Sequence, residues 1–195
     1  MIRRIFLAAM LVLTFLAGCG GGGGGGNKAT LAEAQTFFND GDYEGALQAY
    51  TDLISSEGAP AIAGAGWSAI RLKHYSQADS FFTTFGPIYS LNADGYAGWS
   101  FAEWARGDVS NSLNRATSAF NAAPPFTSLS FDSRVTANHL IWIQASCYLQ
   151  TGFYNECYSK ILLLDHLYDM PTGTVFEVGN ALLQKLQSLG VASTV

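Results

Sequence analysis

The chain has 195 residues, of which 49% are hydrophobic and 13% charged, and its net charge is −5 at neutral pH. An acidic chain with so few cations argues against binding to nucleic acid or to an anionic membrane surface. The length and the hydrophobic content suit one domain with a sizeable core.

The first 19 residues have the pattern of an export signal. Arg3 and Arg4 precede an apolar run at residues 5–15, which is shorter than the roughly 20 residues that span a bilayer. Leu16-Ala17-Gly18-Cys19 follows, and it resembles the lipobox of bacterial lipoproteins. The resemblance implies a signal peptide at 1–18, cleavage before Cys19, a diacylglycerol thioether on its sulfur and an acyl chain on its new amino group. The alternative is an ordinary signal in which the cysteine is accidental.

Residues 20–26 are all glycine, and we interpret residues 19–28 as the lipidated cysteine with a flexible tether. The position after Cys19 is Gly20, whereas enterobacterial lipoproteins kept at the inner membrane carry Asp there. By analogy we expect a protein anchored by lipid in the outer membrane, facing the periplasm or the cell surface.

Four similar turns recur along the rest of the chain, each between two segments of helical length. They are Gly41-Asp42-Tyr43, Lys73-His74-Tyr75, Gly107-Asp108-Val109 and Gly152-Phe153-Tyr154. Small residues also stand 12 positions apart across each turn, in the pairs Ala34/Ala46, Gly66/Ala78, Ser100/Ser112 and Ala145/Cys157. Small residues at this spacing allow the backbones of two antiparallel helices to cross closely.

These units resemble the tetratricopeptide repeat (TPR), in which two antiparallel helices form each repeat. The resemblance implies an all-α fold: an α-solenoid of about four hairpins that winds as a right-handed superhelix. It covers residues 29–170, with hairpins at about 29–58, 60–90, 93–124 and 134–170. Residues 171–195 are expected to form a C-terminal capping helix and a tail, because the last repeat of such an array needs a cover for its apolar face.

The pattern departs from the repeat at three places. The second turn has Lys73-His74 instead of Gly-Asp, and Ala116 stands where the third unit should carry an aromatic residue. Residues 121–132 add about a dozen positions that include Pro124-Pro125, which we interpret as a loop between the third and fourth units.

Two cysteines, Cys147 and Cys157, remain after lipidation of Cys19. On the repeat scaffold Cys157 lies at a helix crossing, whereas Cys147 points about 200° away from the crossing residue Ala145. We therefore expect two small thiols in the core, and the alternative is a disulfide of an exported protein.

No catalytic or metal-binding motif is recognisable, and His74, His139 and His166 are far apart in the chain. We expect a protein that is not an enzyme, binds no metal and has no cofactor beyond the lipid on Cys19.

In TPR proteins the first helices of successive hairpins line a concave face. The resemblance places seven residues there as partner-binding candidates: Phe38, Trp67, Arg71, Phe101, Trp104, His139 and Trp142. Aromatic and arginine side chains suit the anchoring of a peptide. The alternative is that they fill the core between hairpins, and Trp104 and Trp142 are the strongest candidates for the groove. Only Arg71 and Lys28 could make this face basic, so a clamp for a carboxy-terminal carboxylate is not expected.

The function expected from these features is a membrane-anchored lipoprotein scaffold that binds an envelope protein or peptide, with no role for nucleic acid. The alternative is a lipoprotein that binds glycans or peptidoglycan fragments by stacking the aromatic residues on sugars.

Overall fold

The computed structural model describes residues 29–130 and 132–190, so the lipobox and the glycine tether lie outside it. The described part is helical, with one isolated β-bridge between Ser128 and Thr136 and no strand. Its helices are α1 (Leu31–Asn39), α2 (Tyr43–Glu57), α3 (Ala59–Arg71), α4 (Tyr75–Tyr89), α5 (Ala93–Ala105), α6 (Val109–Ala122), α7 (Ala137–Gln150), α8 (Tyr154–Leu164) and α9 (Val175–Ser188). Each of these helices is too short or too polar to cross a bilayer.

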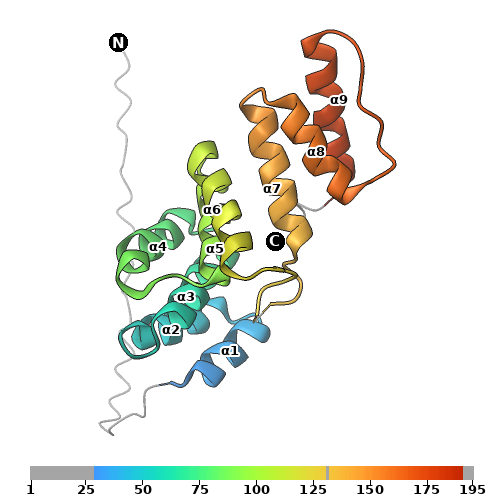
Figure 1. The fold of residues 1–195 in the computed structure, drawn as a ribbon. Coiled ribbons are helices and arrows are strands. Elements are labelled where there is room, and N and C mark those ends of the chain that lie inside the picture. The colour runs from blue at the N-terminus through green and yellow to red at the C-terminus, as the bar shows by residue number, and fades with distance from the viewer. Residues whose placement is uncertain (1–28, 131, 191–195) are drawn as a thin grey trace, which may run out of the picture.

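Consecutive helices pair as hairpins, and the hairpins stack on one another (Figure 1). The pairs are α1 with α2, α3 with α4, α5 with α6 and α7 with α8, while α9 packs against both α7 and α8. The predicted all-α architecture of four stacked hairpins with a closing helix is confirmed.

The turns between paired helices require a left-handed backbone. Gly41, Gly107 and Gly152 have φ values of 82°, 83° and 78°, which glycine adopts without steric cost. Lys73 takes the same place in the second turn with φ of 61°, although a side chain makes this conformation unfavourable.

The small residues predicted at the helix crossings are all buried. At the third crossing Ser100 and Ser112 bond reciprocally: each hydroxyl donates to the backbone oxygen of the other residue, at 2.9 Å. This pair joins α5 to α6 without leaving a polar group unsatisfied.

Glycine also makes room for an aromatic ring between the second and third hairpins. Phe82 of α4 lies fully buried between Gly66 of α3 and Gly98 of α5, and a β-carbon at either glycine would collide with its ring. The same ring stacks on Trp99 with centroids 6.2 Å apart. The close packing of α3, α4 and α5 therefore depends on two glycines and one phenylalanine.

The apolar interior falls into two clusters. The larger runs from α1 to α7 and contains Cys147, and the smaller consists of Ala145, Cys157, Ile161, Leu182 and Leu186 from α7, α8 and α9. Both cysteines are free and buried, so the expectation of two core thiols is confirmed. Burial raises the pKa of Cys147 to about 11 and that of Cys157 to about 12.

Residues 123–136, which we call the insert, connect α6 to α7, and their described part, 123–130 and 132–136, is an irregular loop with a cis bond between Pro124 and Pro125. Figure 1 shows the insert reaching from the α6 end towards α1 before it returns to α7. Phe126, Leu129 and Val135 of the insert are buried in the larger cluster. The insert is thus part of the folded core.

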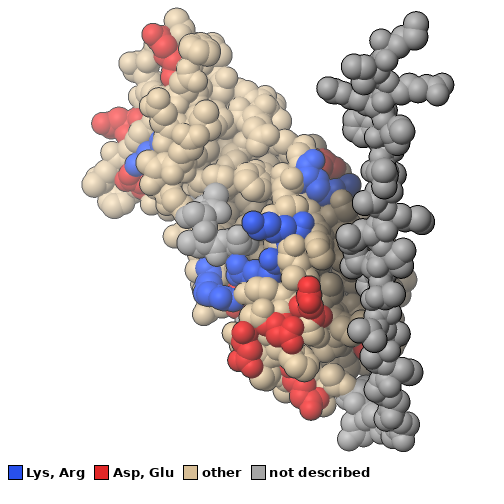
Figure 2. Space-filling model, turned by 180° about the vertical axis from the view of Figure 1, so that it is seen from behind, with Lys and Arg blue, Asp and Glu red and all other residues tan. Residues whose placement is uncertain are grey.

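Charge is sparse on the surface. Figure 2 shows a group of Lys and Arg side chains in the middle of one face beside a group of Asp and Glu, while most of that face is uncharged. The electrostatic potential of this face is therefore set by a few charged side chains.

Candidate functional site

Two residues expected on the concave face belong to the core instead. Phe38 of α1 and Trp67 of α3 are completely buried, and the indole nitrogen of Trp67 donates to the backbone oxygen of Asp94 at 3.0 Å. Their assignment to a partner-binding surface was wrong, because a side chain with no exposed surface cannot contact a partner. Trp67 links α3 to α5, and Phe38 packs on Tyr43 at the start of α2.

The insert occupies the part of the concave face where Arg71 was expected to meet a partner. Arg71 Nη2 lies 2.7 Å from Oδ2 of Asp132, and the two side chains are only 9% and 3% exposed. Arg134 bonds the other carboxylate oxygen of Asp132 through its Nε, also at 2.7 Å. Burial would raise the pKa of Asp132, but hydrogen bonds from Arg134 and Arg71 outweigh it and hold the pKa below its ordinary value.

A second contact fixes the insert to the start of the next inner helix, α5. The carboxylate of Asp94, at the start of α5, accepts hydrogen bonds from the backbone N–H and the hydroxyl of Ser130. A cleft of about 210 Å³ remains beside it, with Leu31, Gln35 and Tyr50 among its lining residues. Along α1, α3 and α5, the predicted groove is therefore largely filled by the chain itself.

His139 has a structural role at the start of α7. The backbone N–H of Thr136 donates to its Nδ1 at 3.0 Å, which completes a capping box, and the ring is almost completely buried. Burial lowers the pKa of His139, so the ring is neutral at physiological pH and does not offer a cation to a partner.

The three remaining aromatic candidates lie along α5 and α7. Phe101 is nearly buried and packs on Trp67, whereas Trp104 and Trp142 are half-buried. The rings of Trp104 and Trp142 meet edge to face, with centroids 5.3 Å apart and planes inclined by 75°. The indole nitrogen of Trp142 donates to the backbone oxygen of Leu186 in α9 at 3.0 Å, while no described residue accepts from that of Trp104. These two tryptophans are the predicted aromatic groove residues that are only partly buried, and Arg71, which is also partly exposed, is paired with Asp132.

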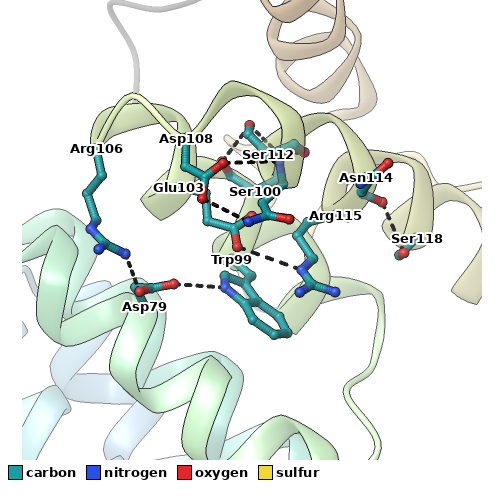
Figure 3. A network of polar contacts seen from close by, with 11 residues as sticks. Asp79, Trp99, Ser100, Glu103, Arg106, Asp108, Ser112, Asn114, Arg115 and Ser118 are labelled. Atoms are coloured by element: carbon teal, nitrogen blue, oxygen red, sulfur yellow. Dashed lines mark hydrogen bonds and ion pairs between the residues drawn. The ribbon is translucent and has the colours of Figure 1, made fainter.

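A polar network that the sequence did not reveal ties α4, α5 and α6 together (Figure 3). Asp79 of α4 forms an ion pair with Arg106 and accepts from the indole nitrogen of Trp99 at 2.9 Å. On the other side of Trp99, the guanidinium of Arg115 lies 3.6 Å from the ring centroid. Trp99 is thereby held between a carboxylate and a cation.

Glu103 completes this network at a buried position. Its Oε1 lies 3.8 Å from Nε of Arg115, and its Oε2 has no hydrogen-bond partner among the described residues. Burial raises the pKa of Glu103 to about 7, although the charge of Arg115 opposes the shift. A raised pKa is also a mark of catalytic acids, but the charged partner of Glu103 is Arg115, which packs on Trp99 in the same structural network. The described residues contain no group of three or more potential metal ligands.

Comparison with known proteins supports the fold. No family model matches the chain, and no curated protein matches it. Among solved structures, it is similar to a tetratricopeptide repeat protein from Parabacteroides merdae ATCC 43184, with a TM-score of 0.54 and 14% sequence identity. The likeness covers 81% of this chain and 59% of that protein, so the chain spans less than two thirds of its neighbour's length. At this identity the likeness shows a TPR-like fold alone.

Proposed function

We propose that this protein is a non-catalytic scaffold, anchored by lipid at Cys19, that binds a protein or peptide partner in the bacterial cell envelope. The observation that carries the proposal is the surviving exposed part of the concave face, where Trp104 and Trp142 form one aromatic cluster on a TPR-like solenoid. TPR-like folds commonly act as scaffolds for protein interaction, so the fold agrees with this proposal.

The tryptophan cluster has the properties of an interaction hot spot. Both rings are half-buried, so their orientation is fixed while part of each remains available. The bond from Trp142 to Leu186 fixes one ring further. Large rigid side chains lose little entropy on binding and contribute much of the energy at protein interfaces. Two rings inclined by 75° do not form one flat platform for a sugar, which favours a peptide over a glycan.

The proposed anchor rests on the amino-terminal sequence, which lies outside the described residues. Cys19→Ser would remove the sulfur that accepts diacylglycerol, so incorporation of an alkyne-labelled fatty acid should disappear and the protein should leave the membrane fraction. Labelling that persists in Cys19→Ser would contradict the anchor without affecting the proposed partner-binding surface.

The scaffold function is tested with a photo-crosslinking amino acid at position 104 of the full-length lipidated protein in its native envelope. We expect a discrete protein adduct from this position. The matched control places the same amino acid at Thr84, an exposed site on α4 away from the concave face. Adducts from position 84 alone, or adducts at 104 that contain only glycan, would refute the assignment.

A further inference from the structure

A second groove lies on a different side of α7 from the tryptophan cluster. It has a volume of about 400 Å³ between α6, α7 and α8, and it is lined by Thr117, Phe120, Ile141, Gln144, Tyr148, Lys160 and Leu163. On α7, Ile141, Gln144 and Tyr148 are spaced by three and four residues and share one side of the helix. Trp142 is about 100° to 160° away from these three residues around the helix axis. This groove and the concave face are therefore separate surfaces.

Gln144 leaves a hydrogen-bond acceptor unused in the wall of the groove. The residue is only 4% exposed, and its Nε2 donates to the hydroxyl of Thr117 at 3.1 Å. Thr117 in turn donates to the backbone oxygen of Leu113 at 3.0 Å, so the direction of both bonds is settled. The Oε1 of Gln144 accepts from no described residue. That atom is itself buried, and a buried acceptor without a donor is unfavourable, so turning the amide towards the groove to meet a ligand's donor would satisfy it.

Lys160 places a cation at the same groove without a countercharge. The side chain of Lys160 is half-buried in α8, and the described part of the chain brings no carboxylate within ion-pair distance of its Nζ. Burial lowers the pKa of Lys160, as expected for a charge that has lost part of its water and gained no partner. An incoming carboxylate would offset that loss.

The rest of the groove is apolar. Phe120 and Tyr148 supply aromatic surface, Ile141 adds aliphatic surface, and Leu163 of the same lining is 63% exposed. A ligand must therefore combine an apolar side chain with a nearby carboxylate and a hydrogen-bond donor. A peptide segment offers all three, because its backbone N–H groups recur beside every side chain.

We propose that this groove binds a peptide segment of a partner protein in which a large apolar residue stands next to a carboxylate. The carboxylate pairs with Lys160, the apolar side chain packs on Phe120 and Tyr148, and an amide N–H donates to Gln144 Oε1. The proposal rests on the scaffold function and adds a second surface with a defined ligand chemistry.

The test uses a photo-crosslinking amino acid at position 163 of the full-length lipidated protein in its native envelope, with the adduct sequenced by mass spectrometry. We expect adducts to peptides that carry Asp, Glu or a terminal carboxylate beside an apolar residue. Lys160→Met should lower the adduct yield at least about tenfold, whereas Lys160→Arg should retain it. Lys73→Met, the same change at an exposed turn, should leave the yield unchanged.

A measurement of melting temperature distinguishes a loss of binding from a loss of folding in this test. Lys160→Met removes a half-buried unpaired cation, so its melting temperature should equal or exceed that of the wild type. Adducts that persist in Lys160→Met, or that consist of glycan, would overturn the proposal. Adducts from position 104 with none from position 163 would overturn this inference and leave the scaffold function standing, whereas no protein adduct from either position would refute both.

Discussion

The first three hairpins and the last hairpin with its cap are built from the same repeat but packed differently. The amino-terminal region, α1 to α6, encloses Trp67 and Phe82 and is braced by the insert. The carboxy-terminal region, which consists of α8, α9 and the side of α7 that packs on them, has a separate core of five residues, none of them aromatic. Most of the exposed large apolar side chains also belong to this region, namely Phe153, Leu163, Leu167, Val175, Phe176 and Leu183.

This difference shows that a repeat pattern fixes the helix crossings but not how tightly neighbouring hairpins pack. Between the second and third hairpins, Phe82 fits into space left by Gly66 and Gly98. Between the third and fourth, the equivalent position is Ala116, which supplies no ring. We therefore expect the amino-terminal region to resist perturbation more strongly and the carboxy-terminal region to open first.

The largest expected effect comes from Phe82→Ala. Removing a fully buried ring between two glycines leaves a cavity that the helices cannot fill, so we expect a loss of about 3–5 kcal/mol in unfolding free energy. Urea titration followed by circular dichroism measures it. Phe176→Ala is the matched control in the other region, where the ring is 77% exposed, and its effect should stay within about 0.5 kcal/mol. Equal losses of unfolding free energy from Phe82→Ala and Phe176→Ala would contradict the expected difference in packing between the two regions.

Breaking the insert's ion pair should have the next largest effect. Asp132→Asn removes the carboxylate that pairs with the buried guanidinium of Arg71, and we expect a loss of about 3 kcal/mol in unfolding free energy together with faster tryptic cleavage after Arg134. Because the folded pKa of Asp132 lies below its ordinary value, its stabilisation is present above pH 3.8 and is lost as the pH falls. The variant should therefore show less acid destabilisation than the wild type. Unchanged stability and cleavage would mean that the insert does not brace this region.

Glu103→Gln is expected to change the unfolding free energy less, and to raise it instead of lowering it. The folded pKa of about 7 lies above the ordinary 4.5, so the contribution of Glu103 is complete below pH 4.5 and is lost as the pH rises through 7. At pH 8 the amide should be more stable than the buried carboxylate by about 1–3 kcal/mol.

The pH dependence of the stability gain from Glu103→Gln identifies its cause. The gain from Glu103→Gln should vanish near pH 4, where the wild-type carboxyl is protonated. Glu57→Gln changes the same group at an exposed site and should give no gain at either pH. A gain that is equal at both values would point to packing instead of ionisation.

The mildest prediction compares two thiols of the same hairpin: Cys147 of α7 lies in the larger cluster, and Cys157 of α8 lies in the smaller one. Both are buried with raised pKa values, so alkylation at pH 8 requires local opening. If the smaller core opens about 1.4 kcal/mol more easily, Cys157 is labelled about tenfold faster than Cys147. Mass spectrometry of peptides after timed alkylation measures both rates in one sample. Faster labelling of Cys147 would reverse the proposed order of stability.

The repeat architecture could be predicted because it depends on local signals. The turns and the small residues 12 positions apart are visible in the sequence, and the structure buries each of those pairs at a crossing. Lys73 did not obscure the second turn, because the residues around it still ended one helix and began the next.

The candidate site was harder to predict because it depends on contacts that are distant in the sequence. Spacing placed Phe38 and Trp67 on the inner helices correctly, but it could not show that neighbouring helices would cover them. Proline and length indicated that the insert was a loop, yet nothing local indicated that Asp132 would reach Arg71. The unpaired groups of Gln144 and Lys160 appear only when α6, α7 and α8 are placed together.

The insert also changes how this array should fold. In a simple repeat protein each unit contacts only its neighbours, so partial unfolding from either end is inexpensive. Here the bond between Arg71 and Asp132 joins positions 61 residues apart, and that between Asp94 and Ser130 joins positions 36 apart. These links reach past the neighbouring helix and raise the contact order of the amino-terminal region. We therefore expect that region to fold slowly and as one cooperative unit.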